Sequence, residues 1–357
     1  MVDLAFTAAA ERLSWEQILA LRVGRVNEVA RLASVLGPGS SNVYLWGDRG
    51  IGKTFLTRLL DHSLKEDHRV LGVRVSAAGH LFGADSLTSV ASGTMLAFLE
   101  TVWTKVLGKK YSELRATLTE APQGDLNLLG PLRSDLERTT VRLYQDVMSG
   151  VMSMTHLTQQ SIGVSLFAKG DIGRSREIQN STPALLPFEF AEYAHELREA
   201  LLREGLHGVT ITLDEANTLS PSSQGDLLSS FIDLFGENGI SFLFIGGYTD
   251  SAMPDIRVSN VFGETEHLRG LDHGSGVALI TKVASACEVT VTDSAAGFMV
   301  HQVGGNPRLL IDLVRRAAEA TRSPVDDRYA SELLQGHQDR MDAERELLQH
   351  PSTQPNH

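Results

Sequence analysis

One eight-residue segment constrains the fold of this chain more than any other. Residues 47–54 read G-x-x-x-x-G-K-T, the pattern of a phosphate-binding loop. Residues 42–46 before it are apolar and favour a β-strand, and residues 55–60 after it carry apolar side chains at helical spacing. A strand, a glycine-rich loop and a helix in this order predict a nucleotide site. The alternative is a glycine turn that only begins a helix.

The residue types of this loop suit a phosphate ligand. Glycines let the backbone turn so that successive N–H groups point inward, and the N-terminus of the next helix adds partial positive charge. We expect Lys53 to contact the β- and γ-phosphates and the Thr54 hydroxyl to bind Mg²⁺. The loop residues that we expect at the nucleotide are Gly47, Asp48, Arg49, Gly50, Ile51, Gly52, Lys53, Thr54 and Phe55.

The composition suits a globular protein without a strong attraction to nucleic acids. The chain has 357 residues, of which 42% are hydrophobic, and a formal net charge of −12. This charge argues against DNA binding by bulk attraction but leaves room for a local basic groove. The single cysteine, Cys287, permits no intramolecular disulfide, which favours a cytoplasmic protein. No segment offers the ~18 apolar residues of a membrane span.

The order of strands and helices predicts an α/β fold with a helical domain after it. Strands alternating with helices favour three layers around a mostly parallel, five-stranded sheet, with functional residues at the carboxyl ends of the strands. From residue 274 onward the pattern is entirely helical. The predicted strands cover residues 42–46, 70–75, 209–213, 241–245 and 266–268.

These elements divide the chain into a core domain at residues 1–272, a small helical lid domain at 273–348 and a disordered tail at 349–357. The core carries an insertion at about residues 84–187, because the stretch between its second and third strands is longer than a simple crossover. In and beside this insertion we expect helices at residues 86–107, 130–154 and 188–203 and a hairpin at 162–171.

An acidic pair follows the third predicted strand. We expect Asp214 to bind Mg²⁺ and Glu215 to act as a general base or to orient the attacking water. The alternative is that both acids only begin a helix, where Asp and Glu are favoured. At the end of the fourth strand, Thr249 or Tyr248 offers a hydroxyl to the γ-phosphate or to the water.

An arginine in the helical region completes the candidate site. Residues 304–308 read G-G-N-P-R, in which Asn306 suits a helix N-cap and Pro307 suits the first helical turn. This fixes the direction of Arg308, whose fork of donors suits the γ-phosphate. Without the rest of the site, a surface arginine is the simpler interpretation.

Together these motifs resemble those of the AAA+ ATPases, a family of P-loop NTPases. The resemblance is greatest to the branch of initiator and origin-recognition ATPases, transposition regulators and STAND signalling ATPases. It covers roughly residues 23–320. The segments that carry it are G-R-V-N-E at residues 24–28, the phosphate loop (Walker A), Asp214-Glu215 (Walker B) and G-G-N-P-R ending at Arg308.

The resemblance implies an ATPase that converts ATP and water to ADP and phosphate with the help of Mg²⁺. It places an adenine pocket at Val23, Gly24 and Arg25, a sensor 1 residue at the end of the fourth strand and a sensor 2 residue at Arg308. It also implies a homo-oligomeric ring or filament. The catalytic residues that it implies are Glu215, Lys53, Arg308 and Thr249.

The chain departs from this family pattern in two places. Initiators often place an arginine finger as Ser-Arg before the fifth strand, where this chain has Ser259-Asn260; Arg257 or Arg269 is the nearest substitute. Hydrolysis is therefore expected to be slow or partner-stimulated. Only 49 residues follow residue 308, too few for the rest of the lid and a DNA-binding winged helix.

Any DNA contact must then come from the ATPase module itself. The candidates are three basic residues that flank the predicted hairpin turn, although basic turn residues are more often only solvated. They are Lys169, Arg174 and Arg176.

The sequence leaves several functions open. The first is an ATPase that couples ATP binding or hydrolysis to assembly, or to the regulation of a partner protein or a DNA complex. The second is a nucleotide-dependent oligomerisation or signalling module with little turnover, similar to STAND proteins and compatible with a role in defence. The third is a factor that remodels or loads DNA.

Overall fold

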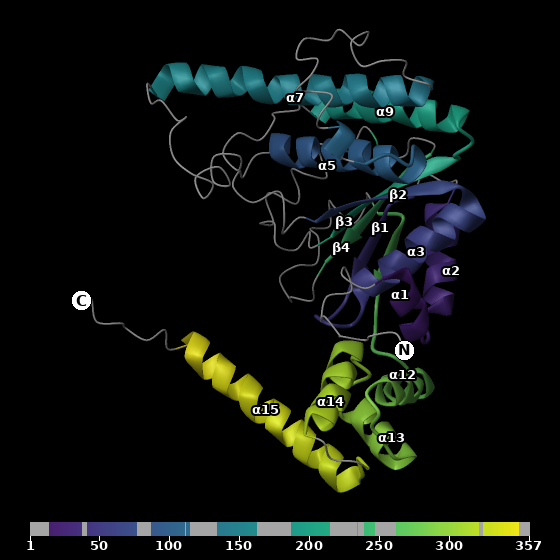
Figure 1. Cartoon of the computed structure of the whole chain (residues 1–357), viewed down its shortest axis with the longest axis vertical. Coiled ribbons are helices and arrows are strands. Elements are labelled where there is room, and N and C mark those ends of the chain that lie inside the picture. The colour runs from purple at the N-terminus through teal and green to yellow at the C-terminus, as the bar shows by residue number, and fades with distance from the viewer. Residues whose placement is uncertain are drawn as a thin grey trace. The chain divides into compact units, whose positions relative to one another are not determined.

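The computed structural model describes residues 14–37, 41–76, 87–110, 112–114, 134–162, 187–214, 234, 239–246, 262–320 and 324–349 (Figure 1). The chain divides into two compact units. The sheet unit comprises Val29–Gly47 and Leu60–His267. The helical unit comprises Met1–Glu28, Asp48–Leu59 and Leu268–His357, so it includes most of the phosphate loop.

The sheet unit is built on a five-stranded sheet, which confirms the predicted fold class. Every pairing between the described strands is parallel. Parallel strands in a row place their carboxyl ends at one edge of the sheet. The strands lie in the order β2 (Val70–Ser76), β3 (Gly208–Asp214), β4 (Ile240–Ile245), β1 (Val43–Trp46) and β5 (Glu264–His267).

The predicted strands agree with these bounds to within two residues. The fifth was expected at residues 266–268 but covers Glu264–His267, because Val43 of β1 already pairs with Glu264. The central strands β3 and β4 are buried on both faces, which explains why they read as apolar runs without alternation.

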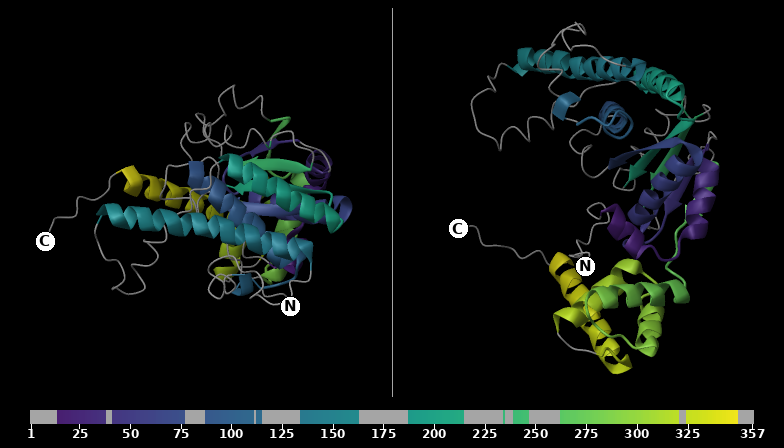
Figure 2. Two further views of the ribbon diagram at one scale, coloured as in Figure 1. Left: turned by 90° about the horizontal axis from the view of Figure 1, so that it is seen from above. Right: turned by 45° about the vertical axis from the view of Figure 1, so that its right-hand side comes forward.

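One face of the sheet packs on a layer of helices. Alternate residues of the strands, such as Ile211, Phe242 and Tyr44, point into a core that these helices cover. Figures 1 and 2 show the layer, in which α7 and α9 run side by side. Its elements are α5 (Leu87–Thr101), the π-helix η2 (Val102–Val106), α7 (Asp135–Ile162) and α9 (Pro187–Arg203).

The opposite face of the sheet contacts α2 (Val26–Leu36) and α3 (Lys53–His68). Thr210 donates its hydroxyl to the carbonyl of Leu36 at 3.4 Å. Asp61 of α3 forms an ion pair with Arg74 of β2, with 3.2 Å between the Nε and Oδ2 atoms. The helices on both faces make the three layers that the sequence predicted.

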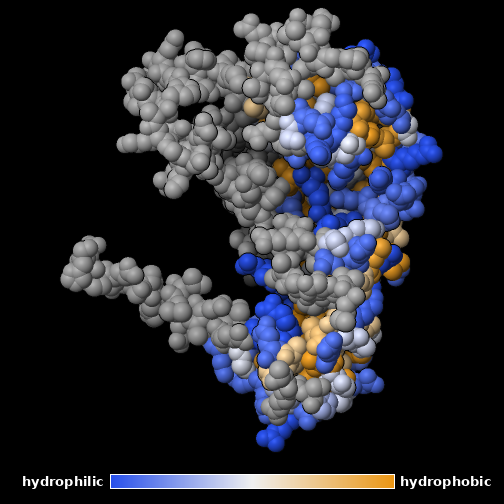
Figure 3. All heavy atoms as spheres, in the orientation of Figure 1, coloured by the Kyte–Doolittle hydropathy of each residue, from blue (hydrophilic) through white to orange (hydrophobic). Residues whose placement is uncertain are grey.

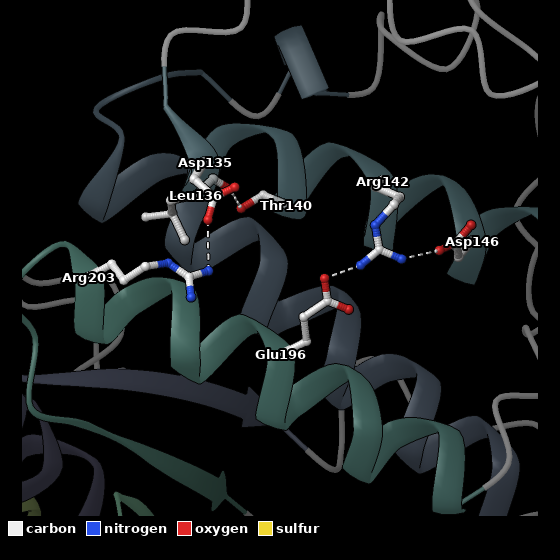
Figure 4. A network of polar contacts seen from close by, with 7 residues as sticks. All are labelled: Asp135, Leu136, Thr140, Arg142, Asp146, Glu196 and Arg203. Atoms are coloured by element: carbon white, nitrogen blue, oxygen red, sulfur yellow. Dashed lines mark hydrogen bonds and ion pairs between the residues drawn. The ribbon is translucent and has the colours of Figure 1, made fainter.

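Ion pairs join α7 to α9 on the surface of the inserted helices (Figure 4). Arg142 contacts Glu196 across the two helices and Asp146 on its own helix, at 3.2 Å for the second pair. Arg203 contacts Asp135 at 2.7 Å. The side chains of this network are largely exposed, so they orient the two helices but add little stability.

One inserted helix differs from the prediction in both of its bounds. The helix expected at residues 130–154 runs from Asp135 to Ile162. Ile162 was assigned to a hairpin, but the chain offers no glycine or proline between residues 151 and 162, and the helix continues to the residue before Gly163. The rest of the predicted hairpin, at residues 163–171, lies outside the described residues.

In the part of the chain that the structure describes, helices of the helical unit pack around a core of their own. Helix α1 is capped by Ser14 through a capping box with Gln17. Leu21 of α1, Ile280 of α12 and Leu313 of α14 are among the core residues. The helices are α1 (Trp15–Leu21), α12 (His273–Ala286), α13 (Asp293–Gln302), α14 (Pro307–Glu319) and α15 (Asp327–Gln349).

The described residues on one face of the molecule are mixed in polarity. Hydrophilic residues (blue) and apolar residues (orange) are interspersed on the face that Figure 3 shows. In the part of the chain that the structure describes, no helix combines the length and the apolar character needed to cross a membrane.

Candidate nucleotide-binding site

The phosphate loop joins a buried strand to a long helix. Strand β1 ends at Trp46, and α3 begins at Lys53. Gly50 has φ 83° and Gly52 has φ 97°, conformations that residues with a Cβ rarely adopt. The N–H of Leu56 donates to the carbonyl of Gly52 at 2.8 Å, which closes the first turn of the helix. The N–H groups before Leu56 stand at the positive end of the helix dipole.

Two donors inside the loop point at one oxygen. Lys53 Nζ donates to the carbonyl of Asp48 at 2.9 Å, and the N–H of Ile51 points to the same carbonyl at 3.4 Å. Both donors are groups that the motif provides for phosphate. Thr54 lies in the first turn of α3 with its side chain partly exposed.

The lead-in at residues 23–28 is held by Arg25. Arg25 has φ 64°, in the left-handed region, and only 8% of the residue is exposed. Its guanidinium donates to Glu28 Oε1 at 2.9 Å, to the carbonyl of Ile51 at 3.2 Å and to the carbonyl of Arg269 at 2.6 Å. These contacts explain why arginine and glutamate stand three residues apart in G-R-V-N-E.

A pocket of about 390 Å³ lies beside the lead-in. Gly24 borders it with φ 64°, and a Cβ on this residue would come within 2.9 Å of Ser275 Oγ. The pocket walls come from the lead-in, the first turn of α2 and the segment that begins α12. They comprise Gly24, Arg25, Val26, Asn27, Glu28, Gly270, Leu271, Asp272 and Ser275. Val23 packs against the core of the helical unit.

Arg308 begins directly beside the phosphate loop. Its Cβ lies 3.0 Å from the position that a Cβ on Gly50 would take, and its N–H points to the carbonyl of Gly50 at 3.4 Å. Asn306 caps α14, with Oδ1 accepting from the N–H groups of Arg308 and Leu309 at 3.1 and 3.4 Å. The Arg308 side chain is exposed, and its guanidinium makes no hydrogen bond or ion pair with the described residues.

The acidic end of β3 lies at the carboxyl edge of the sheet. Asp214 is the last residue of this strand, is partly exposed and pairs with Ser76 of β2. Gly246 follows β4 at the same edge, where a Cβ would overlap the hydroxyl of Tyr44. Burial raises the pKa of Tyr44, so this hydroxyl stays protonated at neutral pH. No sequence pattern predicts this contact.

An aromatic stack lies at the carboxyl ends of β1 and β5. The rings of Trp46 and His267 are 3.8 Å apart and inclined by 6°. Trp46 directly precedes the loop, so this stack anchors the residue from which the loop departs.

Several predicted site residues lie outside the described residues, and their roles stay predictions. Of the candidate arginine fingers, Arg269 is described; it is exposed, and its carbonyl accepts from Arg25. The predicted site residues that lie outside the described residues are Glu215, Tyr248, Thr249 and Arg257, together with the basic residues Lys169, Arg174 and Arg176.

A further contact in the site was missed by sequence reasoning. Asn306 was predicted only as a helix cap, yet its Nδ2 also donates to the carbonyl of Arg49 at 3.1 Å. The available signal was the choice of Asn rather than Asp, Ser or Thr, because among these capping residues only Asn has an amide donor.

Comparison with known families identifies one domain. A family model for the AAA ATPase domain matches residues 22–245, which include the lead-in, the phosphate loop and β3. No curated protein matches the chain.

Several solved structures are similar to this one. The Walker-type ATPase PABY2304 of Pyrococcus abyssi is 15% identical, with a TM-score of 0.51 over 93% of this chain and 77% of that chain. Cdc6p from Pyrobaculum aerophilum is 17% identical, with a TM-score of 0.43 and 84% and 62% covered. The Orc1 protein of Aeropyrum pernix, solved in complex with DNA, is 16% identical, with a TM-score of 0.45 and 90% and 67% covered.

Proposed function

Since the chain belongs to the AAA ATPase domain family, we propose that it couples ATP binding or hydrolysis to assembly, or to the regulation of a partner protein or DNA complex. The observation that carries the proposal is the phosphate loop. Its glycines take left-handed conformations, and Lys53 stands at the start of α3 with its Nζ turned back into the loop. This is the arrangement of donors that a polyphosphate requires.

In this proposal the loop binds the phosphates, and Lys53 contacts the β- and γ-phosphates. Thr54 and Asp214 are assigned to Mg²⁺. A hydroxyl and a carboxylate are oxygen donors, which suit this hard cation, and both side chains are partly exposed. Magnesium, when bound, neutralises charge on the phosphates. Val23 and Gly24 are assigned to the adenine. Arg25 is assigned to the same region, where its guanidinium supports the lead-in.

The chemical step uses residues whose roles rest on the sequence. Glu215 accepts a proton from a water that attacks the γ-phosphorus, and the bond to the oxygen bridging the β- and γ-phosphorus breaks, which releases ADP and phosphate. Thr249 orients the water or the γ-phosphate. Arg308 stabilises charge on the transferring group, for which its exposed, unengaged guanidinium is suited.

Two substitutions test this proposal. Lys53→Ala should abolish tight binding of ATP and ADP, whereas Glu215→Gln should leave binding intact and stop turnover. Binding is measured by titration calorimetry with Mg²⁺, and turnover by steady-state phosphate release. Wild-type protein that retains no adenine nucleotide at millimolar concentration would refute the proposal. Turnover by the Glu215→Gln variant would refute only the assignment of the base.

A second candidate is a module in which ATP promotes oligomerisation or signalling with little turnover. It is favoured by the sequence Ser259-Asn260 at the place of the usual Ser-Arg finger. We propose a cytoplasmic homo-oligomer in either case, with slow or partner-stimulated hydrolysis. Light scattering with and without ATP measures assembly, and phosphate release with and without DNA separates the candidates. Brisk release by the protein alone would exclude the second candidate.

A further inference from the structure

Three consecutive carbonyl groups of the phosphate loop, at residues 49–51, accept hydrogen bonds from outside the loop. The first accepts from Asn306 Nδ2 at 3.1 Å. The second accepts from the backbone N–H of Arg308 at 3.4 Å, and the third from Arg25 Nη2 at 3.2 Å. All of these residues belong to the helical unit. The outer side of the loop is therefore fixed by the lead-in and by the turn before α14.

These contacts also fix the inner side of the loop. In a planar trans peptide, the C=O of one residue and the N–H of the next point in opposite directions. A hydrogen bond that holds the carbonyl of Arg49 outward therefore turns the N–H of Gly50 inward. Inward-pointing N–H groups are what a phosphate nest consists of. The contact from Asn306 thus orients the N–H of Gly50, a hydrogen-bond donor for phosphate that Asn306 itself does not touch.

Asn306 makes this contact while it caps a helix. Its Oδ1 accepts from the N–H groups of Arg308 and Leu309, and its Nδ2 donates to the carbonyl of Arg49. Its Oδ1 also lies 3.1 Å from the position of a Cβ on Gly50, so the side chain lies directly against the loop. One amide therefore joins the loop to the first turn of the helix that carries Arg308.

We propose that Asn306 is a positioning residue of the phosphate loop. Through the carbonyl of Arg49 it orients the N–H of Gly50 toward a phosphate, and through its cap it fixes the start of Arg308 relative to the same loop. This inference rests on the proposed nucleotide site. It goes beyond that site in making loop geometry depend on one amide N–H₂ group of the helical unit.

The substitution Asn306→Asp isolates this role. Asp is as good a helix cap as Asn, and its charge favours a helix N-terminus, so α14 should be retained. The carboxylate has no donor and would face the carbonyl of Arg49 with a negative charge. The matched control is Thr292→Asp. Thr292 caps α13 by accepting from the N–H of Ala295, so this substitution also places a carboxylate at a helix N-terminus but away from the loop.

The experiment measures nucleotide affinity and loop order in the full chain. Asn306→Asp should weaken ATP and ADP alike by about tenfold, since it replaces one hydrogen bond with a repulsive contact. Hydrogen–deuterium exchange should become faster at residues 48–52 and stay unchanged in α14. Thr292→Asp should change neither quantity. If Asn306→Asp destabilises the chain, Asn306→Ser serves instead, because serine caps a helix without charge and has no amide to reach Arg49.

The outcomes separate this inference from the function on which it rests. Wild-type protein without nucleotide affinity would refute both. Wild-type affinity retained by the Asn306 variants, or unchanged exchange in their loop, would overturn the positioning role and leave the proposed function standing. Faster exchange in α14 as well as in the loop would assign Asn306 to capping alone, which also overturns the inference.

Discussion

Among the buried side chains of the lead-in, removal of Arg25 should lower the free energy of unfolding most. Its guanidinium satisfies the carbonyls of Ile51 and Arg269 and pairs with Glu28. Substitution by Ala leaves two carbonyls without this donor, at about 1–3 kcal/mol each when they stay buried. Glu28 is 29% exposed and can be hydrated, so its loss adds little. We therefore expect Arg25→Ala to lower the free energy of unfolding by about 3 kcal/mol.

The backbone conformation of Arg25 allows a second test, in which a glycine variant is compared with the alanine variant. A residue with a Cβ at φ 64° is less stable than glycine by roughly 1–2 kcal/mol. Arg25→Gly loses the same hydrogen bonds as Arg25→Ala but relieves this strain, so it should be more stable than Arg25→Ala by about 1 kcal/mol. This order would be reversed if Arg25 acted only through its side-chain volume.

The assay is urea denaturation followed by far-UV circular dichroism, with nucleotide absent. Arg22→Ala is the matched control, because Arg22 is exposed and lies three residues earlier in the same segment; it should stay within about 0.5 kcal/mol of wild type. A loss below 0.5 kcal/mol for Arg25→Ala would refute the reasoning. So would a glycine variant less stable than the alanine variant.

Three further outcomes follow from contacts in both units. Gly305→Ala should cost at least about 2 kcal/mol in urea denaturation, because its Cβ would overlap the carbonyl of Leu271, whereas Gly304→Ala should cost only about 1 kcal/mol, since its Cβ would meet nothing within 4 Å. Asp272→Asn should flatten the dependence of stability on pH. Hydrogen bonds from Ser275 lower the pKa of Asp272, so its contribution is complete above about pH 4 and is lost as the pH falls through the lower folded pKa; an unchanged acid limb of the thermal-melting profile would contradict this. Arg142→Ala should cost no more than about 1 kcal/mol, because both Arg142 and Glu196 are more than 40% exposed, and a larger loss would show that the pair is desolvated in solution.

The sequence predicted the sheet well because local signals determined it. Buried strands such as β3 and β4 read as β-branched and apolar runs, and glycines or polar residues mark their ends. Helix starts were also readable, since Ser14 and Asn306 are strong caps and Pro307 fits only the first turn. Each of these signals determines the structure only within a few residues of its own position in the sequence.

The features that the sequence did not predict depend on contacts between segments that are distant along the chain. Arg25 donates to carbonyls 26 and 244 residues away along the chain. A backbone carbonyl is present in every residue, so the sequence does not indicate which carbonyl will accept a hydrogen bond from a given side chain. The same holds for the hydroxyl of Tyr44 above Gly246. The end of α7 was missed for another reason: Ile162 was assigned to a hairpin, although no glycine or proline ends the helix before Gly163.

The two family motifs flanking the phosphate loop share one physical task. G-R-V-N-E supplies Arg25 to the carbonyl of Ile51, and G-G-N-P-R supplies Asn306 and the N–H of Arg308 to the two carbonyls before it. Because a nest can turn its N–H groups inward only while its carbonyls point outward, these distant motifs complete what the glycines begin. A loop with the same consensus but without these hydrogen bonds to its carbonyls would have a flexible backbone, and the direction of its N–H donors would not be fixed. In the proposed site, the consensus at residues 47–54 supplies the donors for phosphate, and the hydrogen bonds from residues 25, 306 and 308 fix the direction of those donors.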